Sequence, residues 1–397
     1  MTFKGKRILV GVTGGIAAYK AAELVRLLVK EGADVRVAMT EAATRFITPV
    51  TMQALSGQPV WSDLWDGRVA DNMGHIELSR DREVIVVAPT SADFMAKLAH
   101  GLADDLLSTL CLARRCPLLL APAMNVEMWQ NPATQRNLEM LHEDDVLFAG
   151  PVAGDQACGE TGFGRMLEPA GIVDELVAFF QPKRLAGKRV LVTAGPTEEP
   201  VDPVRVLTNA SSGKMGYAVA RAAREAGAEV TLVSGPVALA TPPGVLRIDV
   251  RTAHEMFDAV KKTAKSCDVF ISVAAVADYR VKNPSTQKIK KGNGKELSLD
   301  LEENPDILAW VAALPKPPFC VGFAAESEKL AQNAAAKRAK KKLPLIAANL
   351  VQEALGAEQN SIVLFDDRGE HPLGRGPKIE LARKLLEHVA GMLSQEK

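Results

Sequence analysis

The sequence predicts an α/β protein of two domains, each a Rossmann-like three-layer structure with a mainly parallel sheet. Three observations carry this prediction. The chain has 397 residues, and a single hydrophobic core stops growing beyond about 250 to 300 residues. Strands of buried type alternate with amphipathic helical segments, which is the pattern of parallel sheets covered on both faces. The same order of strand, turn, helix and strand opens each half of the chain.

The repeated order starts at Lys6 in the first half and at Lys188 in the second. In the first copy, KRILVGV is a strand, TGG is a tight turn, and an amphipathic helix leads into the strand that ends before Thr40. The second copy pairs KRVLVTAGPT with a helix and strand that end in GAEVTLVSG. Further strands are predicted at residues 83–88, 117–121, 269–273, 319–323 and 345–348.

The segment QPKRLAGK, from Gln181 to Lys188, combines proline, glycine and charge as linkers do. We therefore expect one domain over residues 1–181 and a second over residues 189–397. In open parallel sheets, ligands bind at the carboxyl ends of the strands. The turns that follow the predicted strands are thus the places to look for functional residues.

Composition excludes several classes of protein. The 48 Lys and Arg residues balance 48 Asp and Glu residues, which disfavours general nucleic-acid binding. No apolar run reaches the roughly 18 residues that span a bilayer, and the first residues enter a strand directly. The five cysteines show no CxxC pair or regular Cys/His spacing, so neither a disulfide framework nor a structural zinc site is expected. We expect a cytoplasmic protein without nucleic-acid or membrane partners.

The first glycine turn is a candidate anion site. Gly11, Gly14 and Gly15 do not make the GxGxxG fingerprint of dinucleotide-binding proteins. The turn still exposes backbone N–H groups at a helix N-terminus, where partial positive charge favours a phosphate. A tight turn with a purely structural role fits these residues equally well.

Three other segments of the first half carry polar residues near strand ends. Thr90, Ser91 and Asp93 follow one strand, and they either contact a ligand or cap the next helix. Asn125 follows the next strand, where an amide can orient a ligand. His75 lies among apolar and small residues, a setting in which a lone histidine is more often structural than catalytic.

Taken together, the first half resembles the flavin-containing cysteine decarboxylases. The matching pieces, in family order, are TGGIAAYK, AMTEAA, MGHIEL, APTSAD, PAMNVEMW and QACGETGFGRM. The resemblance implies that FMN provides the electron sink for decarboxylation, with substrate facing His75 and Asn125 and a proton donated by Cys158. The residues that it assigns to FMN are Gly14, Gly15, Thr40, Thr90, Ser91 and Asp93. The family often has asparagine at positions 93 and 104, where this chain has Asp93 and Asp104.

The second half offers several charged candidates. SSGKMG is not a Walker P-loop, because Thr208 and Met215 occupy positions that need Gly and Ser or Thr. Residues 211–213 form either a helix cap or a different anion cradle. Asp278 ends a strand, where it can hold a ribose hydroxyl or magnesium, or cap a turn. Lys288, Lys290 and Lys291 lie in a predicted mobile hairpin or loop, and a solvated charge run explains them as well.

A helix predicted from about Ser327 to Lys342 places Lys337 and Lys341 on one face. These lysines either face a ligand or simply complement the helix dipole. The sequence pattern alone does not choose between the two roles.

The second half resembles the phosphopantothenate-cysteine ligase domain. The matching pieces are TAGPTEEPVDPVR, NASSGKMG, AAVADYR, KIKK, NPDIL and GFAAE. The resemblance implies that CTP and Mg²⁺ activate 4'-phosphopantothenate as an acyl cytidylate, which Asn209 orients for attack by cysteine. Lys288 would act from a lid, and Asp278 would also hold the metal. The residues that the resemblance assigns to CTP are Asp278, Lys288, Asn304, Pro305, Asp306, Ile307, Leu308, Phe323, Lys337 and Lys341. The chain departs from the family pattern at Glu198, Ala210 and Leu350.

The order of the two resemblances is that of the bacterial bifunctional coenzyme A enzymes. It implies that one chain ligates cysteine to 4'-phosphopantothenate and decarboxylates the product to 4'-phosphopantetheine. It also implies a homo-oligomer, with a dodecamer as a candidate assembly. Two rival hypotheses are a decarboxylase whose second domain only assembles subunits, and a flavin-fold protein that binds partners without catalysis.

Overall fold

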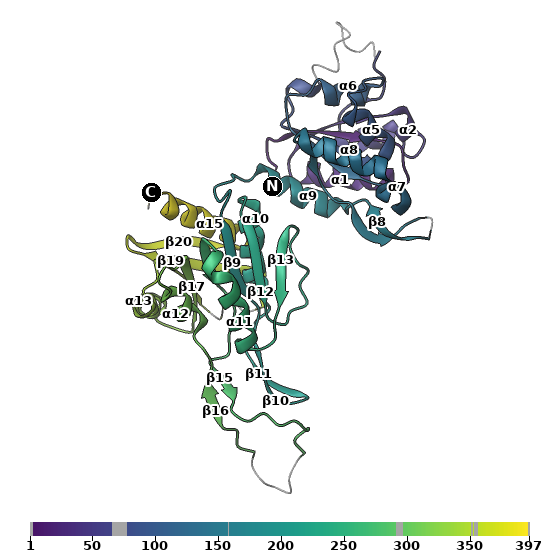
Figure 1. Ribbon diagram of the computed structural model, residues 1–397. Coiled ribbons are helices and arrows are strands. Elements are labelled where there is room, and N and C mark those ends of the chain that lie inside the picture. The colour runs from purple at the N-terminus through teal and green to yellow at the C-terminus, as the bar shows by residue number, and fades with distance from the viewer. Residues whose placement is uncertain are drawn as a thin grey trace. The chain divides into compact units, whose positions relative to one another are not determined.

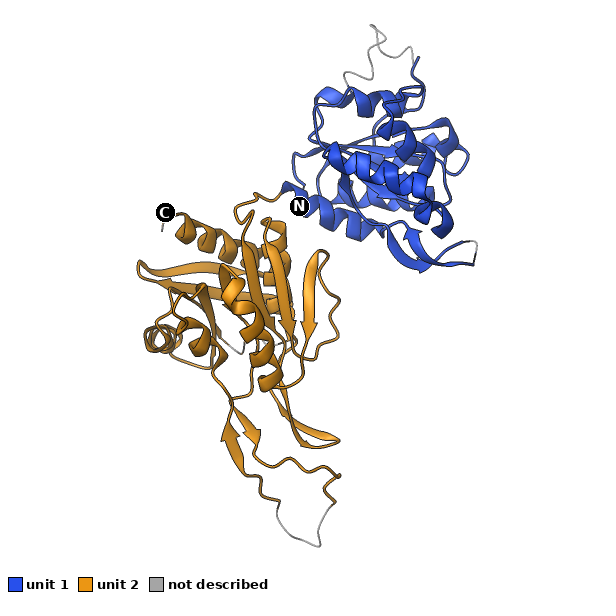
Figure 2. Cartoon of the chain, in the orientation of Figure 1, with its two compact units in different colours: residues 1–180 blue, residues 181–397 orange. Residues whose placement is uncertain are grey.

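The computed structural model describes residues 3–65, 78–157, 159–290, 297–350, 352 and 356–395. The chain divides into two compact units, residues 1–180 and 181–397 (Figure 2). Three residues singled out from the sequence, His75, Cys158 and Lys291, lie outside the described residues. Both units are α/β, and the prediction of Rossmann-like domains with mainly parallel sheets is confirmed.

Unit 1 is built on a six-stranded sheet in which every pairing is parallel. The strand order is β3-β2-β1-β4-β5-β6, so the order in which the chain adds strands reverses between β1 and β4. Side chains of β1 alternate between two cores, with Ile8 and Val10 on one face and Leu9 on the other. The strands are β1 (Arg7–Val12), β2 (Asp34–Met39), β3 (Val60–Trp61), β4 (Val84–Thr90), β5 (Leu118–Pro122) and β6 (Leu147–Phe148).

Helices cover both faces of this sheet. One face packs against α1 (Ala18–Lys30), α3 (Pro49–Ser56) and α9 (Pro169–Phe180). The other face packs against α5 (Ala92–Ala99), α6 (Leu106–Leu112) and α8 (Pro132–Glu143). Short helices α2 (Glu41–Thr44) and α7 (Val126–Gln130) and the antiparallel hairpin β7 (Val152–Asp155) and β8 (Thr161–Arg165) complete the unit.

Unit 2 contains an eight-stranded sheet in the order β13-β12-β9-β14-β17-β18-β19-β20. The first six strands are parallel, and β19 and β20 add an antiparallel edge that the sequence pattern did not predict. This edge is a tight hairpin, with Asp366 paired to Gly369. The strands are β9 (Arg189–Ala194), β12 (Glu229–Ser234), β13 (Val245–Asp249), β14 (Val269–Ser272), β17 (Phe319–Glu326), β18 (Leu345–Leu350), β19 (Gln359–Asp366) and β20 (Gly369–Pro377).

The helices of unit 2 also lie on both faces of their sheet. On one face are α10 (Lys214–Glu225) and α15 (Lys378–Gln395), and on the other are α11 (Ala253–Thr263), the short turn η1 (Ala264–Ser266) and α12 (Ile307–Ala312). Helix α13 (Leu330–Lys341) packs on β17 and β18, and begins at Leu330 rather than near Ser327 as predicted. Two hairpins, β10 (Glu198–Asp202) with β11 (Arg205–Thr208) and β15 (Tyr279–Val281) with β16 (Leu301–Glu303), extend beyond the sheet (Figure 1).

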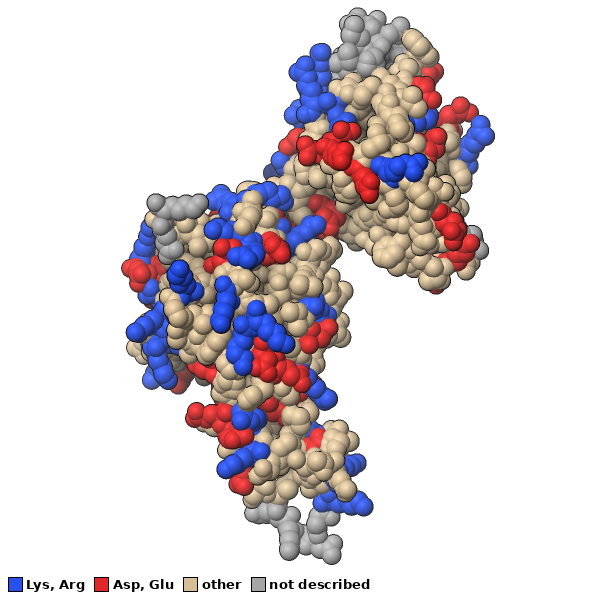
Figure 3. Space-filling view, in the orientation of Figure 1, with Lys and Arg blue, Asp and Glu red and all other residues tan. Residues whose placement is uncertain are grey.

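Acidic and basic side chains are intermingled on the face that Figure 3 shows, in keeping with the balanced composition. Among the described helices, none combines the length and apolar character needed to cross a membrane. Of the four described cysteines, Cys111 and Cys320 are buried, whereas Cys116 and Cys267 are partly exposed; all four are free thiols.

Candidate active sites

The turns after β1, β2 and β4 meet at one edge of the unit 1 sheet, because these strands are neighbours. The amide of Thr40 donates to the carbonyl of Val12 at 3.0 Å. The amide of Ser91 donates to Thr13 Oγ1 at the same distance. These contacts bring the six residues predicted for the flavin to one sheet edge, beside the point where the strand order reverses.

Thr13 was not predicted, although it joins two of these turns. Its side chain is 1% exposed, and Oγ1 donates to the carbonyl of Pro89 at 2.7 Å while it accepts from Ser91. The sequence signal for Thr13 was a hydroxyl residue directly after a strand, but we interpreted the segment TGG only as a turn. Thr13 thus joins the turn after β1 to the turn after β4 through two hydrogen bonds.

The glycine turn leaves open space for a ligand. A Cβ on Gly14 would lie 2.6 Å from that of Ala42, whereas a Cβ on Gly15 would meet nothing within 4 Å. Helix α1 begins after Ala17 without a side-chain cap, and the amides of Ala18 and Lys20 donate to the carbonyls of Gly15 and Ala17, both at 3.0 Å. The chemistry of this turn fits the phosphate of a flavin mononucleotide.

The hydroxyl residues beside the turn also have structural roles. Thr40 Oγ1 accepts from the amide of Ala43 at 3.2 Å and begins α2. Ser91 Oγ accepts from the amide of Phe94 at 3.2 Å and begins α5, as the capping alternative expected. Thr90 is buried and donates to the carbonyl of Val87 at 2.7 Å, and Asp93 is exposed in the first turn of α5.

Asn125 is held at the start of α7 beside the β7–β8 hairpin. Its Oδ1 accepts from the amide of Glu127 at 2.8 Å, and its Nδ2 donates to the carboxylate of Glu160. Gln156 Oε1 accepts from the amide of Val126 at 3.0 Å. Gln156 and Glu160 flank Cys158 in the sequence by two residues on each side. The described residues around Cys158 therefore contact the Asn125 turn.

Unit 2 carries a groove of two adjoining cavities at the carboxyl edge of its parallel strands. The α10 cavity has a volume of about 450 Å³ and is lined by the residues around Ser211 at the start of α10. The α12 cavity has a volume of about 590 Å³ and is lined by the start of α12 and the loop after β14. Four residues line both cavities: Val273, Ala275, Phe323 and Ala325.

The α12 cavity gathers the predicted CTP residues from four segments of the chain. Lining residues include Asp278, Phe323, Lys337, Lys341 and the whole stretch 304–308. The side chain of Asn304 donates to the carbonyl of Ala277 at 2.9 Å and so fixes the loop that bears Asp278. Lys288 is exposed on the extension beyond the sheet and does not line the cavity.

Two lysines dominate the electrostatics of the α12 cavity. Lys337 Nζ donates to the carbonyl of Phe323 at 2.8 Å. Burial lowers the pKa of Lys337, and the charge of Lys341 lowers it further, against the nearby carboxylates. Lys341 pairs with Asp306 at 2.6 Å. The side chains of α13 thus face this cavity rather than serving only the helix dipole.

The α10 cavity has cationic residues that the sequence pattern did not reveal. Lys378 is 7% exposed, and burial together with the charge of Lys214 lowers its pKa. Lys214 pairs with the carboxylate of Glu358. Helix α10 begins after Gly213, which has a left-handed conformation and provides no side-chain cap. Lys378 lies far along the chain from Lys214, so no local motif could have joined them.

Asn209 stands where the two cavities approach each other. Its Nδ2 donates to the carbonyls of Ala275 and Val276, both at 3.1 Å. Thr197 holds the same loop, because its Oγ1 accepts from the amide of Ala277 at 2.9 Å. The loop after β14 is therefore fixed from two sides, and Ala275 forms part of both cavity walls.

Two family models match the two halves of the chain. A flavoprotein family model matches residues 2–181, and the model of the DNA/pantothenate metabolism flavoprotein C-terminal domain matches residues 185–393. The Coenzyme A biosynthesis bifunctional protein CoaBC of Vibrio cholerae is 51% identical over 97% of this chain and 98% of its own length. The Escherichia coli protein of the same name is 49% identical over 98% of each chain.

Among solved structures, the crystal structure of the C-terminal domain of a Coenzyme A biosynthesis bifunctional protein CoaBC is 38% identical. It covers 54% of this chain and 99% of its own length, with a TM-score of 0.47.

Proposed function

Since the chain belongs to the family of Coenzyme A biosynthesis bifunctional proteins, we propose a specific reaction for each of its two units. The chain is an enzyme with flavin-dependent decarboxylase and ligase activities. Residues 189–397 would use CTP to join cysteine to 4'-phosphopantothenate. Residues 1–181 would use FMN to decarboxylate the resulting 4'-phosphopantothenoylcysteine to 4'-phosphopantetheine.

The observation that carries the ligase proposal is the gathering of Asp278, Lys337 and Lys341 around one cavity. Two ammonium groups can neutralise a triphosphate, and their charge stabilises the pyrophosphate that leaves. The Asp278 carboxylate is exposed and has no hydrogen-bond partner in the part of the chain that the structure describes. An oxygen donor of this kind fits Mg²⁺ bound to the nucleotide.

The ligase reaction forms and breaks two bonds in turn. The carboxylate of 4'-phosphopantothenate attacks the α-phosphorus of CTP, and pyrophosphate leaves. The amino group of cysteine then attacks the acyl carbon, and CMP leaves. The α10 cavity, with Lys214, Lys378 and the amides at the start of α10, suits the phosphate of the pantothenate substrate. Asn209, between the two cavities, would orient the acyl cytidylate.

In unit 1, the turn at Gly14 and Gly15 before α1 would hold the FMN phosphate, beside Thr40, Thr90, Ser91 and Asp93. A bound flavin supplies the electron sink that decarboxylation of a cysteine carboxylate requires. Asn125 would donate from Nδ2 to the substrate carboxylate, in place of its present contact with Glu160. Two residues outside the described parts complete the proposal: His75 as base or orienting group, and Cys158 as proton donor.

We also propose a cytoplasmic homo-oligomer, with a dodecamer as the candidate assembly. Four large apolar side chains between residues 16 and 50 are more than half exposed, which favours a subunit contact there. They are Ile16 (64% exposed), Tyr19 (62%), Phe46 (53%) and Val50 (75%). Sedimentation of the purified protein tests the assembly, and a monomer at micromolar concentration would exclude it.

The function is tested with the full-length protein in two separate assays. 4'-Phosphopantothenate, CTP and cysteine should yield 4'-phosphopantetheine, with pyrophosphate, CMP and carbon dioxide. Synthetic 4'-phosphopantothenoylcysteine should be decarboxylated without CTP. Failure of the first assay alone would indicate an inactive second unit, and absence of both pyrophosphate release and decarboxylation would reject catalysis.

The role of Cys158 needs its own variant. Cys158→Ser should retain flavin but lose formation of 4'-phosphopantetheine, whereas Cys116→Ser, in a partly exposed position of the same unit, should remain active. Full activity of Cys158→Ser would remove this thiol from the mechanism.

A further inference from the structure

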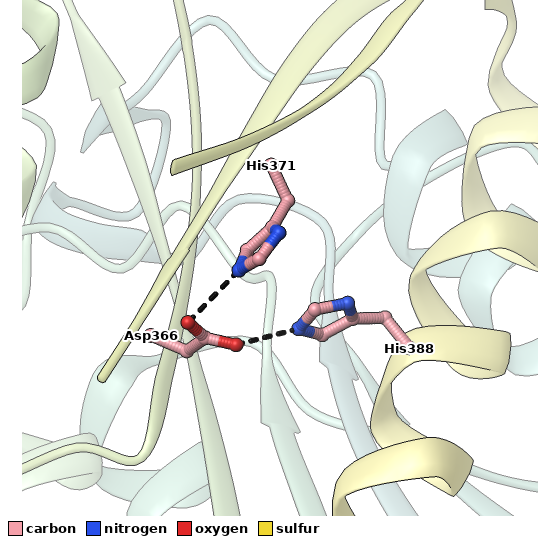
Figure 4. A group of neighbouring side chains, drawn as sticks. All are labelled: Asp366, His371 and His388. Carbon is pink, nitrogen blue, oxygen red and sulfur yellow. Dashed lines mark hydrogen bonds and ion pairs between the residues drawn. The ribbon is translucent and has the colours of Figure 1, made fainter. Parts of the chain in front are cut away.

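A carboxylate and two imidazoles meet at the edge of the unit 2 sheet. Asp366 ends β19, His371 lies in β20, and His388 lies in α15 (Figure 4). His371 Nε2 is 2.9 Å from one carboxylate oxygen of Asp366, and His388 Nε2 is 2.9 Å from the other. The two imidazole rings are tilted against each other, with centroids 4.8 Å apart.

This cluster is separate from the groove described above. Strand β19 begins near Asn360, which lines the α10 cavity, and ends at Asp366. At about 3.3 Å per residue, the strand carries Asp366 roughly 20 Å from Asn360. The three side chains therefore have no part in either proposed reaction.

We propose that Asp366, His371 and His388 bind one divalent transition-metal ion, with Zn²⁺ as the preferred ion. Imidazole nitrogen and carboxylate oxygen are the donors that Zn²⁺ uses in sites with three protein ligands. Mg²⁺ and Ca²⁺ instead favour sets of oxygen donors. One carboxylate and two neutral imidazoles also offset part of the charge of the ion without burying an excess of negative charge.

The spacing of the three groups suits such an ion. Their ligand atoms all lie within 4.8 Å of one another. Tetrahedral Zn²⁺ with bonds of about 2.0 to 2.2 Å places neighbouring ligand atoms about 3.3 Å apart. The 2.9 Å separations between carboxylate and imidazole atoms thus need only a small opening. Both Nε2 atoms already point toward the same carboxylate (Figure 4).

The site is buried at the carboxylate and open to solvent at the two imidazoles. The Asp366 side chain is 2% exposed, whereas His371 is 34% exposed and His388 is 22% exposed. The amide of Arg368 donates to Asp366 Oδ1 at 2.8 Å and helps to orient the carboxylate, as partners outside the ligand set do in known sites. An ion can enter from the solvent side, where a water molecule can complete its coordination.

A bound ion would tie the last helix to the β19–β20 hairpin, because the ligands come from three elements. The expected consequence is a more stable unit 2. Zn²⁺ at about 100 times its dissociation constant should raise the unfolding temperature of this unit by roughly 5 to 10 °C.

The experiment uses the full-length protein after treatment with a chelator, in excess Mg²⁺ to occupy oxygen-rich sites. Zn²⁺ is titrated by calorimetry, and Co²⁺ is titrated by absorption at wavelengths beyond those of flavin. His371→Gln and His388→Gln are the informative variants, since glutamine keeps an N–H donor for Asp366 but is a poor ligand. His254→Gln, at an exposed position of α11, is the matched control.

The wild-type protein and His254→Gln should bind one equivalent of Zn²⁺ and show the Co²⁺ spectrum of a site with nitrogen ligands. His371→Gln and His388→Gln should keep their folded circular dichroism spectra, lose about 100-fold or more in affinity, and lose the thermal shift. Two results would overturn the proposal: no Zn²⁺ binding by the wild-type protein at micromolar concentration, or unchanged binding in both glutamine variants. The three side chains would then only form the hydrogen bonds that join β19, β20 and α15.

Discussion

Lys341, in the last turn of α13, forms an ion pair with Asp306, the residue that begins α12, with 2.6 Å between Nζ and Oδ2. The same carboxylate accepts from the amide of Ala309 at 3.0 Å. Burial raises the pKa of Asp306, but the hydrogen bonds from Lys341 and Ala309 outweigh it, so the pKa lies below its ordinary value. Asp306 therefore caps one helix and holds a lysine of another at the wall of the α12 cavity.

Removing the charge of Lys341 should impair the ligase alone. In Lys341→Met, Asp306 remains ionised beside the proposed triphosphate site without its partner. We expect the KM for CTP to rise by about 10- to 100-fold, which corresponds to the loss of one charged contact. Pyrophosphate release measures this effect. Lys340→Met removes the same charge from an exposed position in the same turn and should leave the KM unchanged; an equal effect in both variants would contradict a local role.

The lowered pKa of Lys337 predicts a pH dependence of CTP binding. The ammonium group is charged below its pKa, and burial places that pKa below the ordinary 10.5. As the pH rises through the lowered value, the positive charge that attracts phosphate is lost, and the KM for CTP should increase. Lys337→Arg stays charged over the same range. Pyrophosphate release measured between about pH 7 and about pH 10 should show the alkaline increase in the wild-type enzyme and not in the arginine variant.

Thr13 should matter for flavin binding because it joins the turns after β1 and β4. Thr13→Val leaves the amide of Ser91 and the carbonyl of Pro89 without their hydroxyl partner. We expect a loss of about 1 to 3 kcal/mol in the free energy of unfolding of unit 1, together with weaker flavin retention. Denaturant unfolding and flavin fluorescence after dialysis measure the two effects. Thr13→Ser keeps the hydroxyl and should behave like the wild type in both.

The contact between Asn125 and Glu160 predicts that a substitution of Glu160 can partly restore the decarboxylation lost by a substitution of Asn125. Asn125→Asp preserves an oxygen that can cap α7 but places a second carboxylate against Glu160. Repulsion should displace the hairpin and reduce decarboxylation by about 100-fold, while the CTP-dependent reaction continues. Addition of Glu160→Gln should restore part of the activity. If the double variant is no better than Asn125→Asp, repulsion by Glu160 is not the cause.

Three of the described thiols should resist modification in the native protein. Burial raises the pKa of Cys111 and Cys320 to about 12 and that of Cys267 to about 11. Because the thiolate is the reactive form, these groups stay protonated and slow to react near neutral pH. Maleimide labelling followed by peptide mass spectrometry should find them unmodified in the folded chain and modified after denaturation. Rapid labelling of any of the three in the folded chain would show that its environment opens readily.

Local sequence patterns were sufficient for the fold class and for most strands of the two large sheets. Strands β1 and β9 are apolar runs bounded by turns, and this local pattern is enough to predict that both faces of each strand are buried. The antiparallel hairpin β19–β20 was not predicted. Its strand β20, GEHPLGRGP, has glycine, proline and charge in place of an apolar pattern, and its pairing with β19 is what makes it a strand.

Most of the residues that the family resemblance assigned to CTP line the α12 cavity. Asp278, Lys337 and Lys341 were predicted as CTP residues, and the structure brings them to one wall, whereas Lys288 lies away from it. Lys288 precedes Ile289, whose amide donates to Asp202 Oδ2 at 3.1 Å and whose carbonyl accepts from Arg205, so it lies beside the β10–β11 hairpin. Its role as a lid residue stays a prediction.

By itself, the sequence determined the two α/β units, the glycine turns at strand ends, and the family to which the chain belongs. Only the tertiary structure decided which distant side chains meet: Lys214 with Lys378 at the α10 cavity, Thr13 with the turn after β4, and Asp366 with His371 and His388. The physical reason is the separation along the chain between the residues that interact. Strand and helix formation reflects the periodicity of nearby residues, whereas these meetings depend on strand order and helix packing, which bring together segments that share no local pattern.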